Sequence, residues 1–203
     1  EIFDYMHFSR LAHLGSNPAG WESWYNHYSN INESLILEDL EKLSSTENII
    51  SRGDSLGLYT SKIFQIDDGW EQALGDWQVR TDRFPRGFNS LVEKIEAKGY
   101  IPGLWIAPFI IDSRSKTAAQ HPDWLLRNAK GELIVAGYNP LWGKKGSFYC
   151  LDLSNDKVIE YLDKLMETLI EDWGFRYIKL DFLYAGMLYG DYINKTASYK
   201  VYN

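Results

Sequence analysis

The sequence predicts an α/β fold of the (β/α)8 TIM-barrel type, with about the first four βα units present in this chain. The first observation is that short β-rich runs alternate with amphipathic helical segments, which is the pattern of a parallel sheet with right-handed crossovers. The second is that polar residues gather where these runs end, at Glu22, at Asp67 and Asp68, and at Lys179 and Asp181. Functional residues at the carboxyl ends of successive strands are typical of such barrels. The third is that no run is followed by a Gly-x-Gly-x-x-Gly turn, which disfavours a dinucleotide-binding fold.

The first two units occupy the N-terminal half of the chain. A β-rich run at 20–25 precedes a helix with Asn32 as its N-cap, in which hydrophobic residues return at three- and four-residue spacing (Leu35, Ile36, Leu40 and Leu43). The second run, at 62–66, is followed by a polar loop over 67–86. A helix from about Ser90 then ends at Gly99.

A long irregular segment, residues 108–149, lies between the last two units and is called the excursion below. The third run is 100–106, and the segment 108–149 has no sustained period and many Pro and Gly breakers. A strong helix, capped by Ser154 or Asn155, follows with a predicted buried stripe of Val158, Leu162, Leu165, Leu169 and Trp173. The fourth run is 176–183. Because no low-complexity linker divides the chain, residues 1–203 are predicted to be a single partial domain.

The composition is that of a folded, acidic chain. The 203 residues are 45% hydrophobic and include 8 Trp, 14 Tyr and 9 Phe, so a disordered chain is excluded. The formal net charge of −7 argues against nucleic acid as the main partner. The longest apolar stretch, 101–111, is about half of the length that a membrane span needs, so no membrane association is expected.

The residues that commonly hold metals are poorly placed for that role. The single Cys150 can form neither an internal disulfide nor a cysteine-based zinc site, and we expect it to be packed. The histidines lack partners at metal-ligand spacing. No metal site is therefore expected.

The fourth run carries a cation and a carboxylate two residues apart. Side chains alternate along a strand, so Lys179 and Asp181 are predicted to share one face. The lysine would favour the ionised form of the aspartate, which suits a nucleophile or an acceptor for ligand hydroxyl groups. A structural ion pair between two inward-facing charges explains the spacing equally well.

The second run ends in Asp67 and Asp68, followed by Gly69 and Trp70. Asp and Gly also form ordinary turns. Paired carboxylate acceptors beside an indole ring suit a sugar, whose hydroxyl groups donate hydrogen bonds and whose C–H face packs on a ring. We expect two or three of the tryptophans to contact a ligand.

Seven ordered blocks resemble the α-galactosidases of glycoside hydrolase family 36, the melibiase group. The blocks lie between residues 20 and 182 and keep the order and approximate spacing of that family. They are GWESWY at 20–25, FQIDDGW at 64–70, GDW at 75–77, GLWIAPF at 103–109, HPDW at 121–124, LDLS at 151–154 and KLDF at 179–182.

The resemblance implies a retaining hydrolase that releases terminal α-linked galactose, as in melibiose and raffinose, on a (β/α)8 barrel without a metal or cofactor. It implies that Asp181 is the nucleophile that forms a covalent galactosyl-enzyme. It also implies that Lys179 binds sugar hydroxyl groups beside it. Asp67 and Asp68 would bind the 4- and 6-hydroxyl groups, whose arrangement distinguishes galactose from glucose.

The resemblance further implies that Trp24 and Trp105 are aromatic walls of the sugar pocket. The family's acid/base aspartate lies in the second half of the barrel, which this chain lacks together with the flanking β-domains. A half-barrel exposes two unpaired sheet edges. We therefore expect the 203-residue chain alone to hydrolyse nothing.

Two alternatives to this function stay open. A galactosyl-transferring enzyme, similar to raffinose synthase, would use the same residues with a sugar instead of water as acceptor. A non-catalytic carbohydrate-binding module belongs to a different class. An α-galactoside is the expected ligand, either self-association or pairing with the missing half-barrel is open, and a cytoplasmic location is expected from the acidic chain with one cysteine.

Overall fold

The computed structural model of the chain describes residues 18–45, 48–57, 59–142, 146–195 and 200. Its central element is a four-stranded parallel sheet with strand order β1-β2-β5-β9. The strands are β1 (Pro18–Glu22), β2 (Ser61–Ile66), β5 (Ile101–Ile106) and β9 (Tyr177–Leu180). Each overlaps one of the predicted β-rich runs. The first run ends earlier than expected, because residues Trp24–His27 form the short helix α2.

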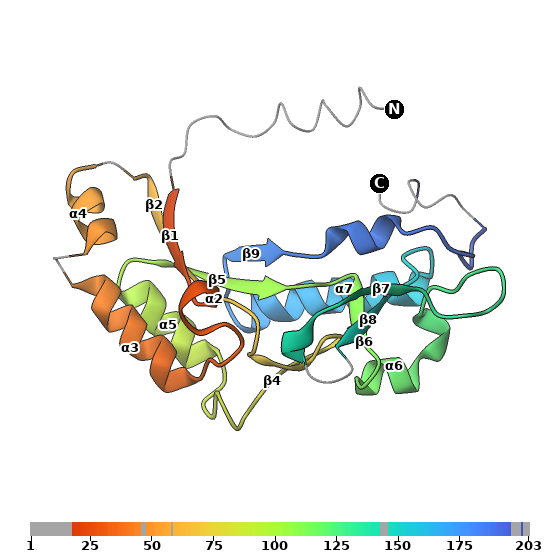
Figure 1. The fold of residues 1–203 in the computed structure, drawn as a ribbon. Helices are drawn as coiled ribbons and strands as arrows, with labels where there is room; N and C mark the ends of the chain where they lie inside the picture. Colours follow the sequence, from red (N-terminus) through yellow and green to blue (C-terminus); the bar gives the residue numbers. More distant parts are fainter. Residues whose placement is uncertain (1–17, 46–47, 58, 143–145, 196–199, 201–203) are drawn as a thin grey trace.

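Three amphipathic helices, α3 (Glu33–Ser44), α5 (Asn89–Ala97) and α7 (Asp156–Glu167), lie along the same side of this sheet (Figure 1). The predicted caps are present: the side chain of Asn32 accepts a hydrogen bond from Leu35 N (3.0 Å), and Asn155 rather than Ser154 caps α7. The last turn of α7 widens into the π-helical turn η4 (Thr168–Asp172). A further helix, α4 (Ile49–Ser55), is not predicted from the sequence. Among the described residues, no helix combines the length and apolarity needed to cross a membrane.

The excursion and the polar loop both contain regular structure that sequence periodicity does not reveal. Within 67–86, β3 (Glu71–Ala73) and β4 (Asp76–Val79) form an antiparallel hairpin. Within 108–149, β6 (Ile110–Asp112), β7 (Val135–Tyr138) and β8 (Ser147–Cys150) form a second sheet in the order β6-β8-β7. The short helix α6 (Lys116–Gln120) and the 3-10 turns η2 (Pro122–Trp124) and η3 (Pro140–Trp142) connect them, and η5 (Leu183–Met187) follows β9. Elements of three to five residues are too short for hydrophobic periodicity to be recognised.

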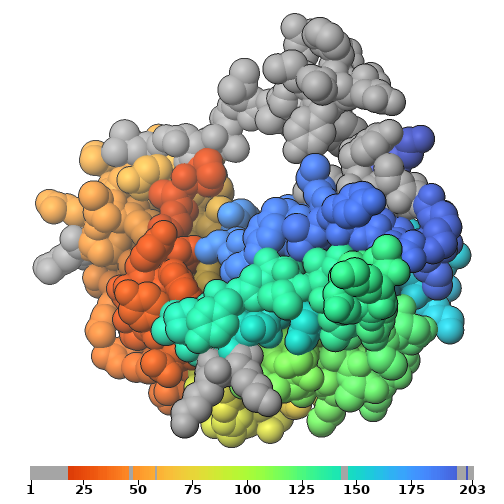
Figure 2. All heavy atoms as spheres, turned by 45° about the vertical axis from the view of Figure 1, so that its right-hand side comes forward, coloured from red at the N-terminus to blue at the C-terminus, as the bar shows by residue number. Residues whose placement is uncertain are grey.

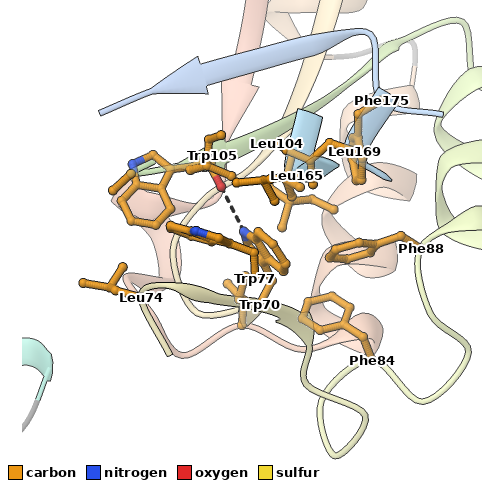
Figure 3. Close-up of a cluster of buried hydrophobic side chains, with 14 of the residues drawn as sticks. Trp70, Leu74, Trp77, Phe84, Phe88, Leu104, Trp105, Leu165, Leu169 and Phe175 are labelled. Atoms are coloured by element: carbon orange, nitrogen blue, oxygen red, sulfur yellow. Dashed lines mark hydrogen bonds between the residues drawn. The ribbon is translucent and has the colours of Figure 1, made fainter. Parts of the chain in front are cut away.

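An aromatic cluster packs the hairpin against β5 and the helices (Figure 3). Trp70, which is fully buried, donates a hydrogen bond from Nε1 to the carbonyl oxygen of Trp105 (2.9 Å). Its ring also packs edge-on against Phe88 and Trp173. The loop after β2 is thereby attached to the carboxyl end of β5, and this attachment positions the residues described next.

Candidate functional site

A small cavity of about 130 Å³ lies at the carboxyl ends of the parallel strands. All six residues singled out by the sequence line it: Trp24, Asp67, Asp68, Trp105, Lys179 and Asp181. They come from segments that are far apart in the chain. The cavity is also lined by three residues that the sequence analysis did not nominate, namely Asn139, Trp142 and Phe182.

Strand register explains this convergence. Glu22 on β1 pairs with Gln65 on β2, and Trp105 on β5 pairs with Lys179 on β9. Residues paired across parallel strands project to the same face at the same height. Asp67 lies two residues beyond Gln65, directly after β2, so its side chain enters the same volume.

Lys179 is the centre of a polar network across three strands. Its Nζ lies 3.0 Å from Glu22 Oε2 and 2.9 Å from Asp67 Oδ2. The amide of Gln65 donates to the same two oxygens, at 3.2 and 2.7 Å. Lys179 and Asp181 line the same cavity, as the strand alternation predicts, but the alternative of an ion pair between these two residues is not seen in the described residues. The ammonium group is bonded to Glu22 and Asp67 instead, because the register places those carboxylates beside it.

Electrostatics in this network favour a charged lysine. Partial burial disfavours the charge of Lys179, but the hydrogen bonds with Asp67 and Glu22 outweigh that effect and raise its pKa above the usual value. Burial raises the pKa of Asp67, and the hydrogen bond from Lys179 opposes this rise. Asp67 is only 2% exposed. A buried carboxylate of this kind keeps its negative charge, and so accepts hydrogen bonds, only while its hydrogen-bond donors stay in place.

Asp181 follows β9 and is fixed through both of its oxygens. Oδ2 accepts a hydrogen bond from Trp105 Nε1 (3.0 Å), and Oδ1 accepts one from the backbone N–H of Phe182 (2.7 Å). Phe182 has φ = 54°, a left-handed conformation that is costly for a bulky residue. Strained residues of this kind cluster at functional sites. Trp105 thus contacts a neighbouring carboxylate directly, in addition to lining the cavity.

The excursion supplies a hydrogen bond to Asp68 and two of the residues that line the cavity, Asn139 and Trp142. Trp142 donates from Nε1 to Asp68 Oδ2 (2.7 Å), and its ring packs on Phe182 with centroids 5.5 Å apart. Tyr184 on η5 donates to the carbonyl oxygen of Ala136 on β7 (2.8 Å). Figure 2 shows this teal segment lying between the orange elements near α2 and the blue C-terminal elements. Trp142 could have been nominated only as one of several loop tryptophans, because nothing local marks it as a neighbour of Asp68.

Two larger hollows, each of about 590 Å³, lie elsewhere on the surface. One of them shares Asp68 and Trp142 with the small cavity, so these two residues form the wall between the two spaces. Cys150 is buried, as expected, and burial raises its pKa to about 12, which is typical of an unreactive thiol. In the described part of the chain, no three His, Cys, Asp or Glu residues are arranged to hold a metal ion.

A parallel sheet whose strand ends supply carboxylates, a lysine and indole rings to one cavity is the arrangement of α/β glycoside hydrolases. The chain belongs to one such family: the family model described as Melibiase matches residues 28–187.

Known proteins with similar sequences and structures are α-galactosidases. Alpha-galactosidase 1 of Pediococcus pentosaceus is 31% identical over 140 residues, which are 66% of this chain and 18% of that protein. The α-galactosidase of Thermus thermophilus, solved in complex with p-nitrophenyl alpha-D-galactopyranoside, has a TM-score of 0.73 and 40% identity over 87% of this chain and 33% of its own. The Lactobacillus brevis enzyme has a TM-score of 0.65 at 27% identity and is covered over 21% of its length. The chain therefore spans about a fifth to a third of these relatives.

Proposed function

We propose that this chain carries the first half of the (β/α)8 catalytic barrel of a retaining α-galactosidase, including its nucleophile and most of its galactose-binding side chains. The observation that carries the proposal is the convergence on one small cavity of the six residues that the sequence analysis singled out. Membership of the melibiase family agrees with the roles that the resemblance implies for them.

Galactose binding is assigned to the acidic pair and the lysine. The carboxylates of Asp67 and Asp68 accept hydrogen bonds from the 4- and 6-hydroxyl groups, and Lys179 donates to a hydroxyl oxygen nearby. The indole rings of Trp24 and Trp105 line the same cavity and supply flat apolar walls. A buried carboxylate that finds no hydroxyl donor is left unpaired, which weakens binding. An epimer of galactose with a misplaced hydroxyl group is therefore bound less tightly.

Asp181 is assigned the role of nucleophile. One of its carboxylate oxygens attacks the anomeric carbon, the glycosidic bond breaks, and the leaving oxygen takes a proton from an acid that lies outside this chain. Water, deprotonated by the same group, then releases galactose with retained configuration. The bonds from Trp105 and Phe182 hold the Asp181 carboxylate in one orientation for the attack.

The barrel is proposed to be completed by a second half. In the described residues, β1 and β9 are the outer strands of an open sheet, and Leu180 at the β9 edge is 45% exposed. The relatives are also much longer than this chain. Without the second half no acid/base residue is present, so the 203-residue chain alone is expected to be inactive.

Binding to the chain itself gives the first test. We expect the 203-residue chain to bind galactose more tightly than glucose in an NMR titration, and to release no nitrophenol from p-nitrophenyl α-galactoside. Asp181→Asn should bind galactose within about threefold of the wild type, because a carboxamide keeps the size of the side chain and its oxygen still accepts one of the two N–H bonds that fix Asp181. Turnover by the chain alone would contradict the half-barrel proposal, and equal affinity for galactose and glucose would contradict the assigned sugar site.

Catalytic activity is tested on the longer enzyme that the proposal expects, expressed from the parent gene with the sequence that follows codon 203. The wild type should release α-galactose as the first product, observed by NMR, and Asp181→Asn should lower kcat by at least about 10³-fold. Asp172→Asn, an exposed aspartate at the end of η4, is the matched control and should stay active. An active Asp181→Asn variant would remove that residue from its role. New trisaccharide formed from sucrose would favour the galactosyl-transferring alternative.

A further inference from the structure

Asn139 lines the small cavity, and the mechanism above assigns it no role. It lies in the excursion, between the end of β7 and the 3-10 turn η3. Its carboxamide combines a hydrogen-bond acceptor, Oδ1, with a two-hydrogen donor, Nδ2. What Asn139 can offer to a ligand therefore depends on which of its polar groups the protein already uses.

Three of the four polar groups of Asn139 have partners in the protein. Its backbone N–H donates to the carbonyl oxygen of Gly146 (2.8 Å), and its carbonyl oxygen accepts from the backbone N–H of Trp142 (3.1 Å). Its Oδ1 accepts from the backbone N–H of Leu141 (3.0 Å), which makes an Asx turn at η3. A backbone N–H can bond only the oxygen of a carboxamide, so this bond also fixes where Nδ2 lies. Nδ2 is the remaining group, and no described residue is bonded to it.

Donors that are free for a ligand are scarce in this cavity, although three carboxylates line it. The indole N–H of Trp105 is bonded to Asp181 (3.0 Å), and that of Trp142 is bonded to Asp68 (2.7 Å). Two of the three N–H bonds of Lys179 are taken by neighbouring carboxylates. A sugar hydroxyl group needs a donor for its oxygen as well as an acceptor for its hydrogen, so the cavity needs further donors.

Two neutral N–H donors on the cavity wall have no partner in the part of the chain that the structure describes. They are Nδ2 of Asn139 and Nε1 of Trp24. Asn139 is the one attached to the surroundings of Asp68, because Trp142 bonds the backbone of Asn139 through its own N–H and the Asp68 carboxylate through Nε1. The turn at η3 thus presents Asn139 on the side of the cavity where Asp68 lies.

We propose that Asn139 is a galactose-binding residue, whose Nδ2 donates a hydrogen bond to the oxygen of the hydroxyl group that donates to Asp68. This inference rests on the proposed function, which assigns Asp67 and Asp68 to the 4- and 6-hydroxyl groups. A hydroxyl group has one hydrogen and two lone pairs, so one group can bond a carboxylate and a carboxamide together. A sugar that places this hydroxyl group elsewhere loses both bonds, which makes Asn139 a determinant of specificity.

NMR titration of the 203-residue chain with galactose tests the donor. Asn139→Ala removes the carboxamide and should bind galactose at least about threefold more weakly. Asn139→Asp keeps the acceptor for Leu141, and with it the turn, but places a carboxylate where the donor was. It should also lose at least about threefold, which shows that the loss does not come from the turn.

Deoxy sugars identify the hydroxyl group. The probes are 2-deoxygalactose, 4-deoxygalactose and 6-deoxygalactose, each titrated into the wild type and Asn139→Ala. Either the 4-deoxy or the 6-deoxy sugar lacks the bonded group, and for that sugar the two proteins should differ by less than about twofold. The 2-deoxy sugar keeps both groups and should show the same loss as galactose.

A second asparagine in the excursion supplies the matched control. Asn128 Oδ1 accepts from the backbone N–H of Lys130 (2.9 Å), which is the same kind of turn, and Asn128 does not line the cavity. Asn128→Ala should bind all four sugars within about twofold of the wild type. If Asn139→Ala does not fold, as judged by near-UV circular dichroism, Asn139→Asp takes its place in the comparison.

The two proposals fail in different ways. A wild-type chain that binds no galactose would refute the proposed function and this inference with it. Wild-type affinity for galactose in a folded Asn139→Ala variant would refute the role of Asn139 and leave the sugar site intact. A loss of equal size for galactose and all three deoxy sugars would also refute it, because a disturbed turn weakens every sugar alike.

Discussion

Replacing Lys179 with methionine tests the polar network that joins β1, β2 and β9. The variant keeps most of the aliphatic stem but leaves Glu22 and Asp67 without their shared cation. Both carboxylate oxygens lie about 3 Å from the same Nζ (3.0 and 2.9 Å), so they are at most about 6 Å apart. In the variant, only the amide of Gln65 bridges them.

The expected loss follows from this distance. Two unit charges about 6 Å apart at an effective dielectric constant of about 20 repel each other by roughly 3 kcal/mol. Water reduces that value, because the side chains of Lys179 and Glu22 are 31% and 24% exposed. Protonation of Asp67, whose pKa burial already raises, relieves part of the rest. We therefore expect Lys179→Met to lower the free energy of unfolding by about 1–3 kcal/mol at neutral pH.

Urea unfolding followed by near-UV circular dichroism measures this loss. Adding Glu22→Gln to Lys179→Met removes one of the two repelling charges and should recover about half of the lost stability. The control is Lys164→Met, since the side chains of the Lys164–Glu167 pair are 66% and 56% exposed, and water screens such a pair so strongly that its loss should hardly change stability. Lys179→Met would refute the reasoning if it cost no more than Lys164→Met.

Two further predictions concern the support beneath the site. Gly69→Ala should lower the free energy of unfolding by at least about 2 kcal/mol in a urea titration, because the new Cβ meets the backbone of Ser29 at φ = 111°, whereas Gly87→Ala at φ = 68° has open space and should cost only about 1 kcal/mol. Trp70→Phe should cost about 2–4 kcal/mol in the same assay, because it leaves a cavity in the aromatic cluster and the carbonyl oxygen of Trp105 without its donor.

Each of these predictions has a contrary outcome. Equal costs for Gly69→Ala and Gly87→Ala would show that the close approach to Ser29 does not limit this turn. A Trp70→Phe variant as stable as the wild type would show that the bond to Trp105 contributes nothing to the attachment of the loop to β5.

The elements with a strong sequence period were predicted correctly. Asn32 and Asn155 cap the helices that follow them, and Val158, Leu165 and Leu169 are buried on one face of the α7–η4 helix. The hairpin at Glu71–Val79 and the small sheet at 110–150 were missed. Their strands contain only three or four residues, and pairing with distant segments determines their structure more than local pattern does.

The residues of the proposed site were nominated from the sequence alone, because carboxylates, a lysine and indole rings at the ends of hydrophobic runs can be recognised locally. Contact partners are not local facts. That Lys179 bonds Glu22 and Asp67, and that Trp142 bonds Asp68, depends on strand register and on how the excursion packs against the sheet. The sequence determines the residue types, but packing sets the distances between them. A shift of one residue in the register of β1 or β9 would turn Glu22 or Lys179 to the opposite face of the sheet.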